Sequence, residues 1–429
     1  MSRKKDDQGA ARPGWYEAGL PHVWLPYAQM KMTRAPLPVA HTHACRIVLC
    51  DGRELVDGIA SWWTACHGYN HPHIREAVER QLALMPHVMF GGLAHEQALT
   101  LARRLAALVP GDLTRVFFSE SGSVAVEIAM KMAVQYWLNR SVSKRRKFLA
   151  FKGGYHGDTT GAMAVSDPHG GMHARFHGLL PEHHIIELPQ NEESAAAFAR
   201  CLERHAEELA GIIVEPLVQG AGGMRFHPAS VLPRLRDAAN RYELILIFDE
   251  IFTGFGRTGS LFACEAASVV PDIITLSKAL TGGTLPLAAT IARGKIFDAF
   301  WSDEPSDALP HGPTFMANAL ACAAANASLD LFEREPRLRQ VADIAVALER
   351  GLAPCRGVPG VKEVRVKGAI GVVELEHIDD LERLRARFVA EGVFVRPFGS
   401  IVYLTPAFTI GAEELAKLTA AVTKVIGTL

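Results

Sequence analysis

The sequence predicts an α/β fold, with a large domain built around a mostly parallel sheet and a smaller α+β domain. From about residue 71, short apolar runs alternate with amphipathic stretches, as expected when helices cover both faces of a parallel sheet. The chain has 429 residues, which exceeds what one compact core usually holds. After about residue 330 the pattern changes to charged helices and strands such as VKGAIGVVELE. These observations together predict two domains.

The expected elements follow the chain in order. Apolar spacing predicts helices over residues 74–84 and 124–138. Short runs rich in Val, Ile, Leu and Phe predict buried strands. These strands lie at 115–118, 148–151, 211–214, 244–248, 273–276 and 287–291. We expect residues 1–65 to form an N-terminal segment that packs with the small domain, 66–329 to form the large domain, and 330–429 to form the C-terminal small domain.

Composition excludes several classes of protein. The chain carries 45 Lys and Arg against 46 Asp and Glu, without the basic stripe of a nucleic-acid binder. No stretch reads as a membrane span, and the charged N-terminus lacks the apolar segment of a secretory signal. The seven cysteines never occur in C-x-x-C spacing, which argues against disulfides or a zinc site. We therefore expect a cytoplasmic protein, without a metal, that acts on a small ligand.

The most informative stretch is LILIFDEIFTGFGRTG, in which an apolar strand ends at Asp249. The next expected strand, in DIITLSKAL, leads to Lys278. Ligands of parallel sheets bind beyond the carboxyl ends of strands, so an acid and an amine are expected to meet there. Pyridoxal phosphate uses that pair, because it needs an amine for a Schiff base and a carboxylate that keeps its ring nitrogen protonated. Asp249 and Lys278 thus predict a pyridoxal phosphate site.

Other motifs fit a phosphorylated aromatic cofactor. In SESGSVAVEIAMKMAVQYW, Gly122 and Ser123 precede a helix whose free amides and dipole would bind a phosphate. Tyr155 in GGYHGDT could stack on the cofactor ring. In HGPTFMAN, Gly312 and Thr314 could add an amide and a hydroxyl to a phosphate site.

Two other interpretations have sequence support. GFGRTG, residues 254–259, satisfies G-x-G-x-x-G and follows a strand, as in a nicotinamide dehydrogenase. That fingerprint should open a helix in the first βαβ unit, whereas this motif lies in mid-chain. His67, His71 and His73 in HGYNHPH could bind zinc, but no cysteine pair completes the ligand set.

With these residues assembled, the sequence resembles the class III aminotransferases of fold type I. It is most similar to the branch that makes 7,8-diaminononanoate from 8-amino-7-oxononanoate in biotin biosynthesis, with S-adenosylmethionine as amino donor. The motifs around Asp249 and Lys278 resemble the whole class, whereas SWW, HVMFGG, GPTFM and VRPFG resemble this branch. The resemblance covers about residues 22–408 and includes WLPY, GIASWWTACHGYNHP, SGSVAVEIAMKMA, GYHGDTTGAM, IIVEPLVQGAGGM, FDEIFTGFGRTG, KALTGGT and KGAIGVVE.

The resemblance implies a role for each matching residue. Lys278, Asp249 and Tyr155 would be catalytic. Pro313 and Thr314 would reach the cofactor phosphate of a neighbouring subunit, which implies a homodimer with shared active sites. The implied cofactor contacts are Gly122, Ser123, Tyr155, Asp249, Lys278, Pro313 and Thr314, and the implied substrate contacts are Tyr27, Trp62, Tyr155, Lys278, Gly312 and Arg396.

Substrate identity rests on fewer residues than the cofactor. The resemblance places Tyr27 against the adenine of S-adenosylmethionine, and Arg396 at the carboxylate of the oxo acid. Related enzymes that use lysine as donor, or that act on ornithine, 4-aminobutyrate or other ω-amino acids, remain alternatives. Glu215, Arg257 and Tyr403 also match positions near the site in the family.

Overall fold

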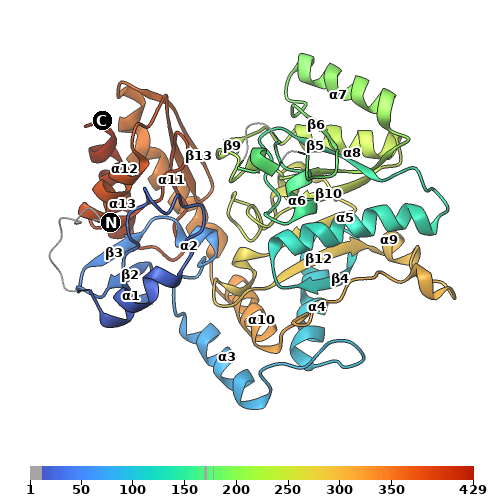
Figure 1. Ribbon diagram of the computed structural model, residues 1–429, viewed down its shortest axis with the longest axis horizontal. Helices are drawn as coiled ribbons and strands as arrows, with labels where there is room; N and C mark the ends of the chain where they lie inside the picture. Colours follow the sequence, from blue (N-terminus) through green and yellow to red (C-terminus); the bar gives the residue numbers. More distant parts are fainter. Residues whose placement is uncertain (1–11, 169–171, 177) are drawn as a thin grey trace.

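The computed structural model describes residues 12–168, 172–176 and 178–429, and Figure 1 shows their arrangement. A seven-stranded sheet with the order β4-β12-β11-β10-β7-β5-β6 forms the centre of the larger part. Only β12 runs antiparallel to its neighbours in this sheet, which confirms the predicted α/β class with a mostly parallel sheet. The strands are β4 Leu113–Ser119, β5 Lys147–Phe151, β6 His184–Ile186, β7 Leu209–Val214, β10 Ile245–Asp249, β11 Ile273–Leu276 and β12 Ala288–Arg293.

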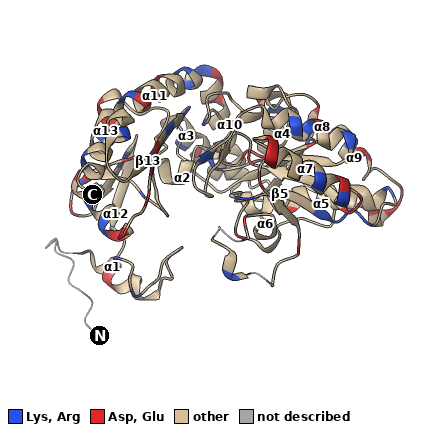
Figure 2. Cartoon of the chain, turned by 90° about the horizontal axis from the view of Figure 1, so that it is seen from above, with Lys and Arg blue, Asp and Glu red and all other residues tan. Residues whose placement is uncertain are grey.

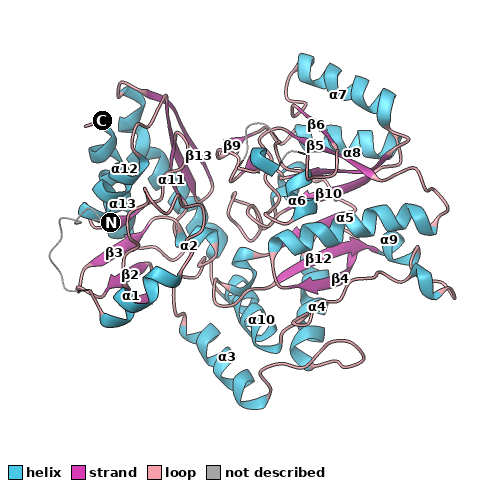
Figure 3. Cartoon of the chain, in the orientation of Figure 1, coloured by secondary structure: helices cyan, strands magenta, loops and turns pink. Residues whose placement is uncertain are grey.

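Both faces of this sheet are covered by helices, as Figure 3 shows. Along β10, Ile245 and Ile247 belong to the apolar cluster beneath α5, whereas Leu246 and Phe248 belong to the cluster beneath α8 and α4. Alternation of side chains along the strand therefore builds two cores from one continuous apolar run. The helices concerned are α4 Glu96–Leu108, α5 Gly122–Asn139 and α8 Val231–Arg241, with α3 Pro72–Leu84, α6 Thr160–Ala164, α7 Glu192–His205, α9 Gly294–Asp298 and α10 Ala319–Arg334 around them.

The expected strands coincide with observed ones, with ends that differ by at most two residues. The sequence patterns missed β6, a three-residue strand at the sheet edge whose residues are only partly buried. Such a short edge strand carries too few apolar residues to stand out from a loop.

A second group of strands joins the two ends of the described chain. β3 Glu54–Asp57 pairs in parallel with β15 Val393–Phe394, so the N-terminal strands share a sheet with a C-terminal one. In Figure 1 the blue N-terminal strands lie beside the red C-terminal helices. This part comprises β1 Val39–His43, β2 Arg46–Leu49, β13 Val361–Lys367, β14 Ile370–Leu375, β16 Ile401–Leu404, α11 Arg337–Leu352, α12 Leu381–Ala390 and α13 Ala412–Ile426.

The division into domains stays a proposal. Residue 330, the expected start of the C-terminal domain, lies inside α10, and α10 packs against α3 and α4 of the larger part. We propose that the boundary falls after α10, before α11 begins at Arg337. The remaining short elements are α1 Gly14–Gly19, α2 Ala60–Trp63, β8 Val218–Gln219, β9 Arg225–Phe226 and the 3-10 turns η1 Leu20–His22, η2 Ala174–Phe176, η3 Ala263–Ala267, η4 Lys278–Thr281, η5 Pro305–Asp307 and η6 Ala353–Gly357.

Charge is distributed over both parts of the molecule. Figure 2 shows basic and acidic residues interspersed along the helices, in keeping with the formal net charge of −1. Within the described residues, no helix combines the length and the apolar character that crossing a bilayer would require.

Candidate active site

A cavity of about 400 Å³ opens where β10 and β11 end and α5 begins. Asp249 is the last residue of β10, and Lys278 starts the 3-10 turn after β11. Because β10 and β11 are parallel neighbours, their carboxyl ends bring the acid and the amine to one edge of the sheet. Five of the residues predicted for the cofactor line this cavity: Gly122, Ser123, Tyr155, Asp249 and Lys278.

The Asp249 carboxylate is buried and held by three hydrogen bonds. Its Oδ2 lies 2.7 Å from Nδ1 of His156, while Oδ1 accepts from the Thr275 hydroxyl at 3.2 Å and from the backbone of Ile251 at 3.1 Å. Burial alone would lower the pKa of His156, but the hydrogen bond and charge of Asp249, with the charge of Glu215, raise it overall. The carboxylate thus makes it easier for the buried imidazole to hold a second proton.

The Lys278 amine lies over an aromatic wall. Its Nζ is 5.0 Å from the centre of the Trp63 ring, and its backbone has a positive φ of 45°. Burial lowers the pKa of Lys278, and the charges of Asp249, Glu215 and Asp158 oppose that effect without reversing it. A lowered pKa increases the fraction of neutral amine, which is the nucleophilic form.

The start of α5 supplies an anion site. Ser121 caps the helix by accepting from the backbone of Val124 at 3.3 Å, so the helix begins at Gly122 with its dipole directed into the cavity. Gly157 closes over this end with φ +132°, and a Cβ there would lie 2.2 Å from the Ser123 hydroxyl oxygen. The amides of Gly122 and Ser123, which precede Val124 in the first turn, have no partners within the helix, so they can bind a phosphate.

Two cavity-lining residues carry buried polar atoms that lack hydrogen bonds to any described residue. These atoms are Nε1 of Trp63 and Oε2 of Glu120. Leaving such groups unsatisfied costs about 1–3 kcal/mol each. A ligand with an acceptor for the indole and a donor for the carboxylate would provide partners for them. Together with the amides at the start of α5, this lining fits a phosphorylated heteroaromatic group.

Tyr155 lines the cavity and also lies beside Tyr27, which is outside the cavity lining. Its backbone donates to Oε2 of Glu215 at 2.9 Å, and its hydroxyl donates to Asp158 at 3.0 Å. Burial raises the pKa of the buried Glu215 carboxyl to about 7. The ring of His173 stacks on Tyr155 at 5.8 Å, so the expected stacking of Tyr155 on a cofactor would use its other face.

A second cluster lies next to Tyr155 and does not line the cavity. It consists of Tyr27, Trp62 and Arg396. The Tyr27 hydroxyl donates to Asp158 at 2.6 Å and lies 3.5 Å from that of Tyr155. The Tyr27 and Trp62 rings are 6.3 Å apart, and the Arg396 guanidinium lies 5.4 Å from the Trp62 ring centre. The structure thus brings together three of the six residues that the resemblance assigns to substrates. Tyr155 and Lys278 line the adjacent cavity.

A strained turn presents Trp62. Residues 60–63, labelled α2, all have positive φ, a conformation that costs roughly 1–2 kcal/mol per non-glycine residue. The buried Asp57 compensates by accepting from the backbones of Ile59 and Ser61 at 2.8 and 2.9 Å. Backbone strain of this kind is concentrated at functional sites, so it supports a role for the turn in binding.

Gly312, Pro313 and Thr314 do not line the cavity of their own chain. Gly312 and Thr314 are exposed, and Pro313 is only partly buried. Their predicted contact with a cofactor phosphate therefore stays a prediction that needs a second subunit.

Some predicted neighbours support the fold around the site. Arg257 is fully buried but lies outside the cavity lining, and its Nη1 donates to the carbonyls of Ala369 and Pro406 at 3.2 and 2.8 Å. Tyr403 packs against Trp63 at 6.2 Å, behind the cavity wall. GFGRTG forms successive turns and opens no helix, which contradicts a dinucleotide fingerprint.

Sequence reasoning assigned no role to His156, Asp158 or His173. His156 and Asp158 occur inside the quoted motif GYHGDTTGAM, so their position beside Tyr155 was the available signal. His173 approaches from a separate loop, where its Nε2 lies 3.4 Å from Oδ1 of Asp158. Nothing in its sequence context indicated that contact.

Comparison with known proteins agrees with the fold and the site. The family described as aminotransferase class-III matches residues 27–426, and the chain belongs to this family. Adenosylmethionine-8-amino-7-oxononanoate aminotransferase of Mycobacterium leprae is 44% identical over 415 residues, covering 95% of each chain. A solved structure of the enzyme of that name from Methanocaldococcus jannaschii has a TM-score of 0.91 at 31% identity, covering 96% of this chain and 98% of the other.

A second solved structure adds information on the cofactor. An amine transaminase from an uncultivated Pseudomonas species, in its PLP-bound form, has a TM-score of 0.86 at 32% identity. It covers 95% of this chain and 98% of its own. Both comparisons confirm the predicted aminotransferase fold.

Proposed function

We propose that this enzyme transfers the amino group of S-adenosylmethionine to 8-amino-7-oxononanoate, giving 7,8-diaminononanoate in biotin biosynthesis, with pyridoxal phosphate as cofactor. One observation carries the proposal: Asp249 and Lys278 end neighbouring parallel strands and line one cavity beside the start of α5. The names of the similar Mycobacterium and Methanocaldococcus enzymes support this choice of substrates. The seven free cysteines fit the cytoplasmic location that we expect.

Each cofactor contact has a physical reason. When bound, pyridoxal phosphate supplies an aldehyde that exchanges amines and a ring that accepts electrons. Gly122 and Ser123 would bind its phosphate through the amides at the start of α5. Asp249, fixed by His156, would accept a hydrogen bond from the ring nitrogen and keep it protonated. Tyr155 would cover one face of the ring.

Lys278 has two tasks in this proposal. Its lowered pKa leaves part of the amine neutral, so Nζ can attach the cofactor covalently. When it is not attached to the cofactor, the same Nζ would be placed to take a proton from the substrate carbon and return one, as general base and acid. Burial of Nζ disfavours its charged form and so supports both tasks.

The outer cluster of Tyr27, Trp62 and Arg396 offers surfaces for two unlike substrates. Among the described residues, no acidic side chain forms an ion pair with Arg396, so its guanidinium is available to a substrate carboxylate. A planar guanidinium can hold that carboxylate through two parallel hydrogen bonds. Tyr27, which is 58% exposed, and Trp62 offer aromatic faces to an adenine ring or an alkyl chain.

The second subunit belongs to the same proposal. We infer a homodimer in which Pro313 and Thr314 of one subunit reach the cofactor phosphate bound by the other. The exposure of Thr314, and of the neighbouring Phe315 at 58%, supports a contact outside the single chain.

A donor experiment tests the function. S-adenosylmethionine, lysine and ornithine are added separately to the cofactor-loaded enzyme while the visible absorbance of the bound cofactor is followed. We expect only S-adenosylmethionine to bleach it, and 8-amino-7-oxononanoate to restore it. Bleaching by lysine alone would assign the donor to the related lysine-dependent type, and bleaching by ornithine alone would assign the chain to another branch of the family.

A further inference from the structure

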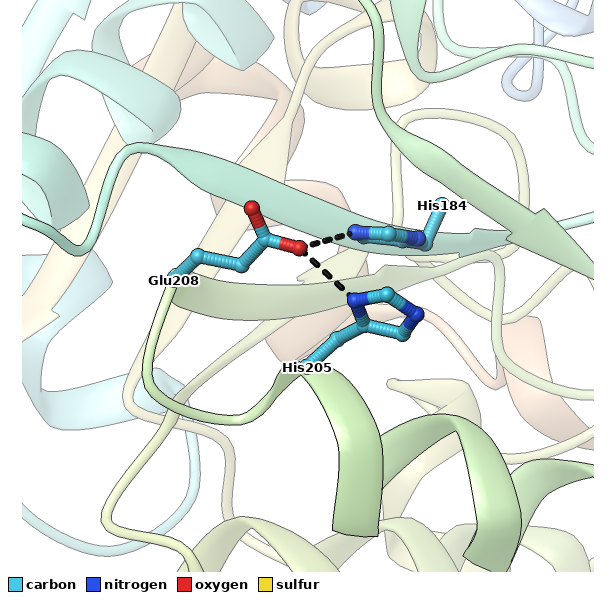
Figure 4. A group of neighbouring side chains, drawn as sticks. All are labelled: His184, His205 and Glu208. Atoms are coloured by element: carbon cyan, nitrogen blue, oxygen red, sulfur yellow. Dashed lines mark hydrogen bonds and ion pairs between the residues drawn. The ribbon is translucent and has the colours of Figure 1, made fainter.

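A cluster of two histidines and one glutamate, shown in Figure 4, lies outside the lining of the catalytic cavity. Oε1 of Glu208 lies 2.9 Å from Nε2 of His184 and 2.8 Å from Nδ1 of His205. The two imidazole rings lie 4.1 Å apart. Both rings thus direct a nitrogen at the same carboxylate oxygen.

The topology places this cluster at the edge of the sheet opposite the active site. β5, β6, β7 and β10 are parallel, and Asp249 is the last residue of β10. His184 is the first residue of β6, and Glu208 immediately precedes β7. The proposed transaminase chemistry therefore gives these three side chains no role.

We propose that His184, His205 and Glu208 bind one divalent transition-metal ion, such as Zn²⁺, as a structural site that joins β6, the end of α7 and the start of β7. Imidazole nitrogens and a carboxylate oxygen are the ligands that Zn²⁺, Ni²⁺ and Cu²⁺ accept. Water would complete the coordination, because all three side chains are only partly buried.

The spacing of the ligand atoms fits a single ion. Two atoms bound about 2.1 Å from a metal, at angles between 90° and 110°, lie about 3.0–3.4 Å apart. The two nitrogen–oxygen distances are slightly shorter than this, and all three ligand atoms lie within 4.8 Å of one another. An ion can therefore enter with small movements of side chains.

The backbone around the cluster is already fixed. The carbonyl of Glu208 accepts from the backbones of Arg146 and Lys147 at 2.9 and 3.0 Å, and its amide donates to the carbonyl of His205 at 3.0 Å. His184 is held in register opposite Leu149 of β5. A site built on paired strands and a helix end loses little conformational freedom when it binds an ion.

Electrostatics favours a cation on the Oε1 side. Nitrogens of Lys147, His184 and His205 all lie within 3.0 Å of the Glu208 carboxylate oxygens, so this carboxylate already attracts groups that can carry positive charge. His205 ends α7, where the helix dipole favours positive charge. The ammonium of Lys147 lies 3.0 Å from Oε2 and opposes a second cation, but it leaves Oε1 to the two imidazoles.

Binding requires neutral imidazoles with lone pairs directed at the ion. In the metal-free cluster both histidines direct a ring nitrogen at the carboxylate. When an ion binds, each histidine would have to carry its proton on its other ring nitrogen.

The test uses the untagged, cofactor-loaded enzyme in a Cys50→Ser background, because Cys50 is the exposed cysteine among the seven. Calorimetric titration with ZnCl₂ should show one ion per chain, with affinity reduced at least tenfold by Glu208→Gln and by His205→Gln. The control is His43→Gln, which alters another close histidine pair, His41 and His43, on β1. It should bind Zn²⁺ like the parent enzyme.

A second measurement separates a structural site from a catalytic one. Zn²⁺ should raise the melting temperature of the parent enzyme but not that of Glu208→Gln, and chelation should leave transamination unchanged. No saturable binding, or binding that both ligand variants retain, would show that the cluster is only a hydrogen-bonded cap of α7. Loss of activity on chelation would also overturn the structural assignment.

Discussion

His156 and Asp249 form a buried pair in which Nδ1 of the imidazole lies 2.7 Å from Oδ2 of the carboxylate. The backbone of His156 is itself fixed by donating to the hydroxyl of Ser166 at 3.0 Å. The loop that carries Tyr155 is therefore tied to the end of β10 through one hydrogen bond. Together with Thr275 and the Ile251 backbone, His156 orients the carboxylate, and its hydrogen bond partly offsets the negative charge.

Asp249→Asn should retain the cofactor but lose transamination. The amide keeps the shape of the side chain and loses the charge that stabilises a protonated ring nitrogen. We expect kcat to fall by about 100-fold or more, equivalent to about 3 kcal/mol. Steady-state kinetics and cofactor content check this together, and exposed Asp303→Asn serves as the control. Near-normal turnover would remove Asp249 from its proposed role.

Lys278 should be the point of covalent attachment. Borohydride reduction of the loaded enzyme followed by peptide mapping should place the cofactor on Lys278, because this amine lines the cavity. Lys152 ion-pairs with Glu187 at 3.1 Å, and Lys131 contacts His311 at 3.1 Å, both away from the cavity lining. A label on either of those lysines would contradict the assignment.

Glu250 should make stability depend on pH. Burial raises the pKa of this carboxyl to about 7, against the hydrogen bonds it accepts from Ala263, Cys264 and Thr253. Because the native state holds the proton more tightly than the unfolded chain, this contribution is complete below about pH 4.5 and is lost as the pH rises through 7. Since one pKa unit equals about 1.4 kcal/mol, the loss is on the order of 3 kcal/mol.

Chemical denaturation between pH 4 and 8 checks this with Glu250→Gln. The parent enzyme's free energy of unfolding, relative to that variant, should fall between about pH 4.5 and 7 and then level off. Exposed Glu203→Gln is the matched control and should track the parent enzyme throughout. A difference that rose with pH would show that Glu250 is ionised in the native state across this range.

The catalytic acid and amine could be predicted because each follows an apolar strand. Parallel strands place their carboxyl ends at one edge of a sheet. The order of the two strands was therefore enough to predict that Asp249 and Lys278 meet there. His156 could not be assigned in this way, because its partner lies 93 residues further along the chain. Its role depends on how a loop folds over the sheet edge.

The cluster of Tyr27, Trp62 and Arg396 was less predictable for a similar reason. The position of Arg396 beside Trp62 depends on β3 pairing with β15, which brings residues near the two ends of the chain together. Hydrophobic periodicity carries no information on such long-range pairing. Only the resemblance indicated this pair. The cluster of His184, His205 and Glu208 had no such guide, since β6 itself was missed.

Arg396 should bind the carboxylate of the oxo acid and contribute little to the half-reaction with S-adenosylmethionine. It lies 5.4 Å from the Trp62 ring centre, and the charge of Arg385 adds to burial in lowering its pKa. Among the described residues no acidic side chain forms an ion pair with Arg396, and a substrate carboxylate would supply that counter-ion. Hydrogen bonds to charged groups are worth about 1.5–3 kcal/mol each, so Arg396→Ala should slow the second half-reaction on the order of 10-fold to 150-fold.

Arg396→Lys should recover only part of that loss, because an ammonium keeps the charge without the planar fork that binds a carboxylate through two hydrogen bonds. Single-turnover kinetics would measure bleaching of the bound cofactor by S-adenosylmethionine separately from its recovery with 8-amino-7-oxononanoate. Arg383→Ala, an exposed arginine on α12, is the control and should leave both steps unchanged. Equal slowing of both steps by Arg396→Ala would mean that the residue serves both substrates or the fold, and the carboxylate assignment would then fail.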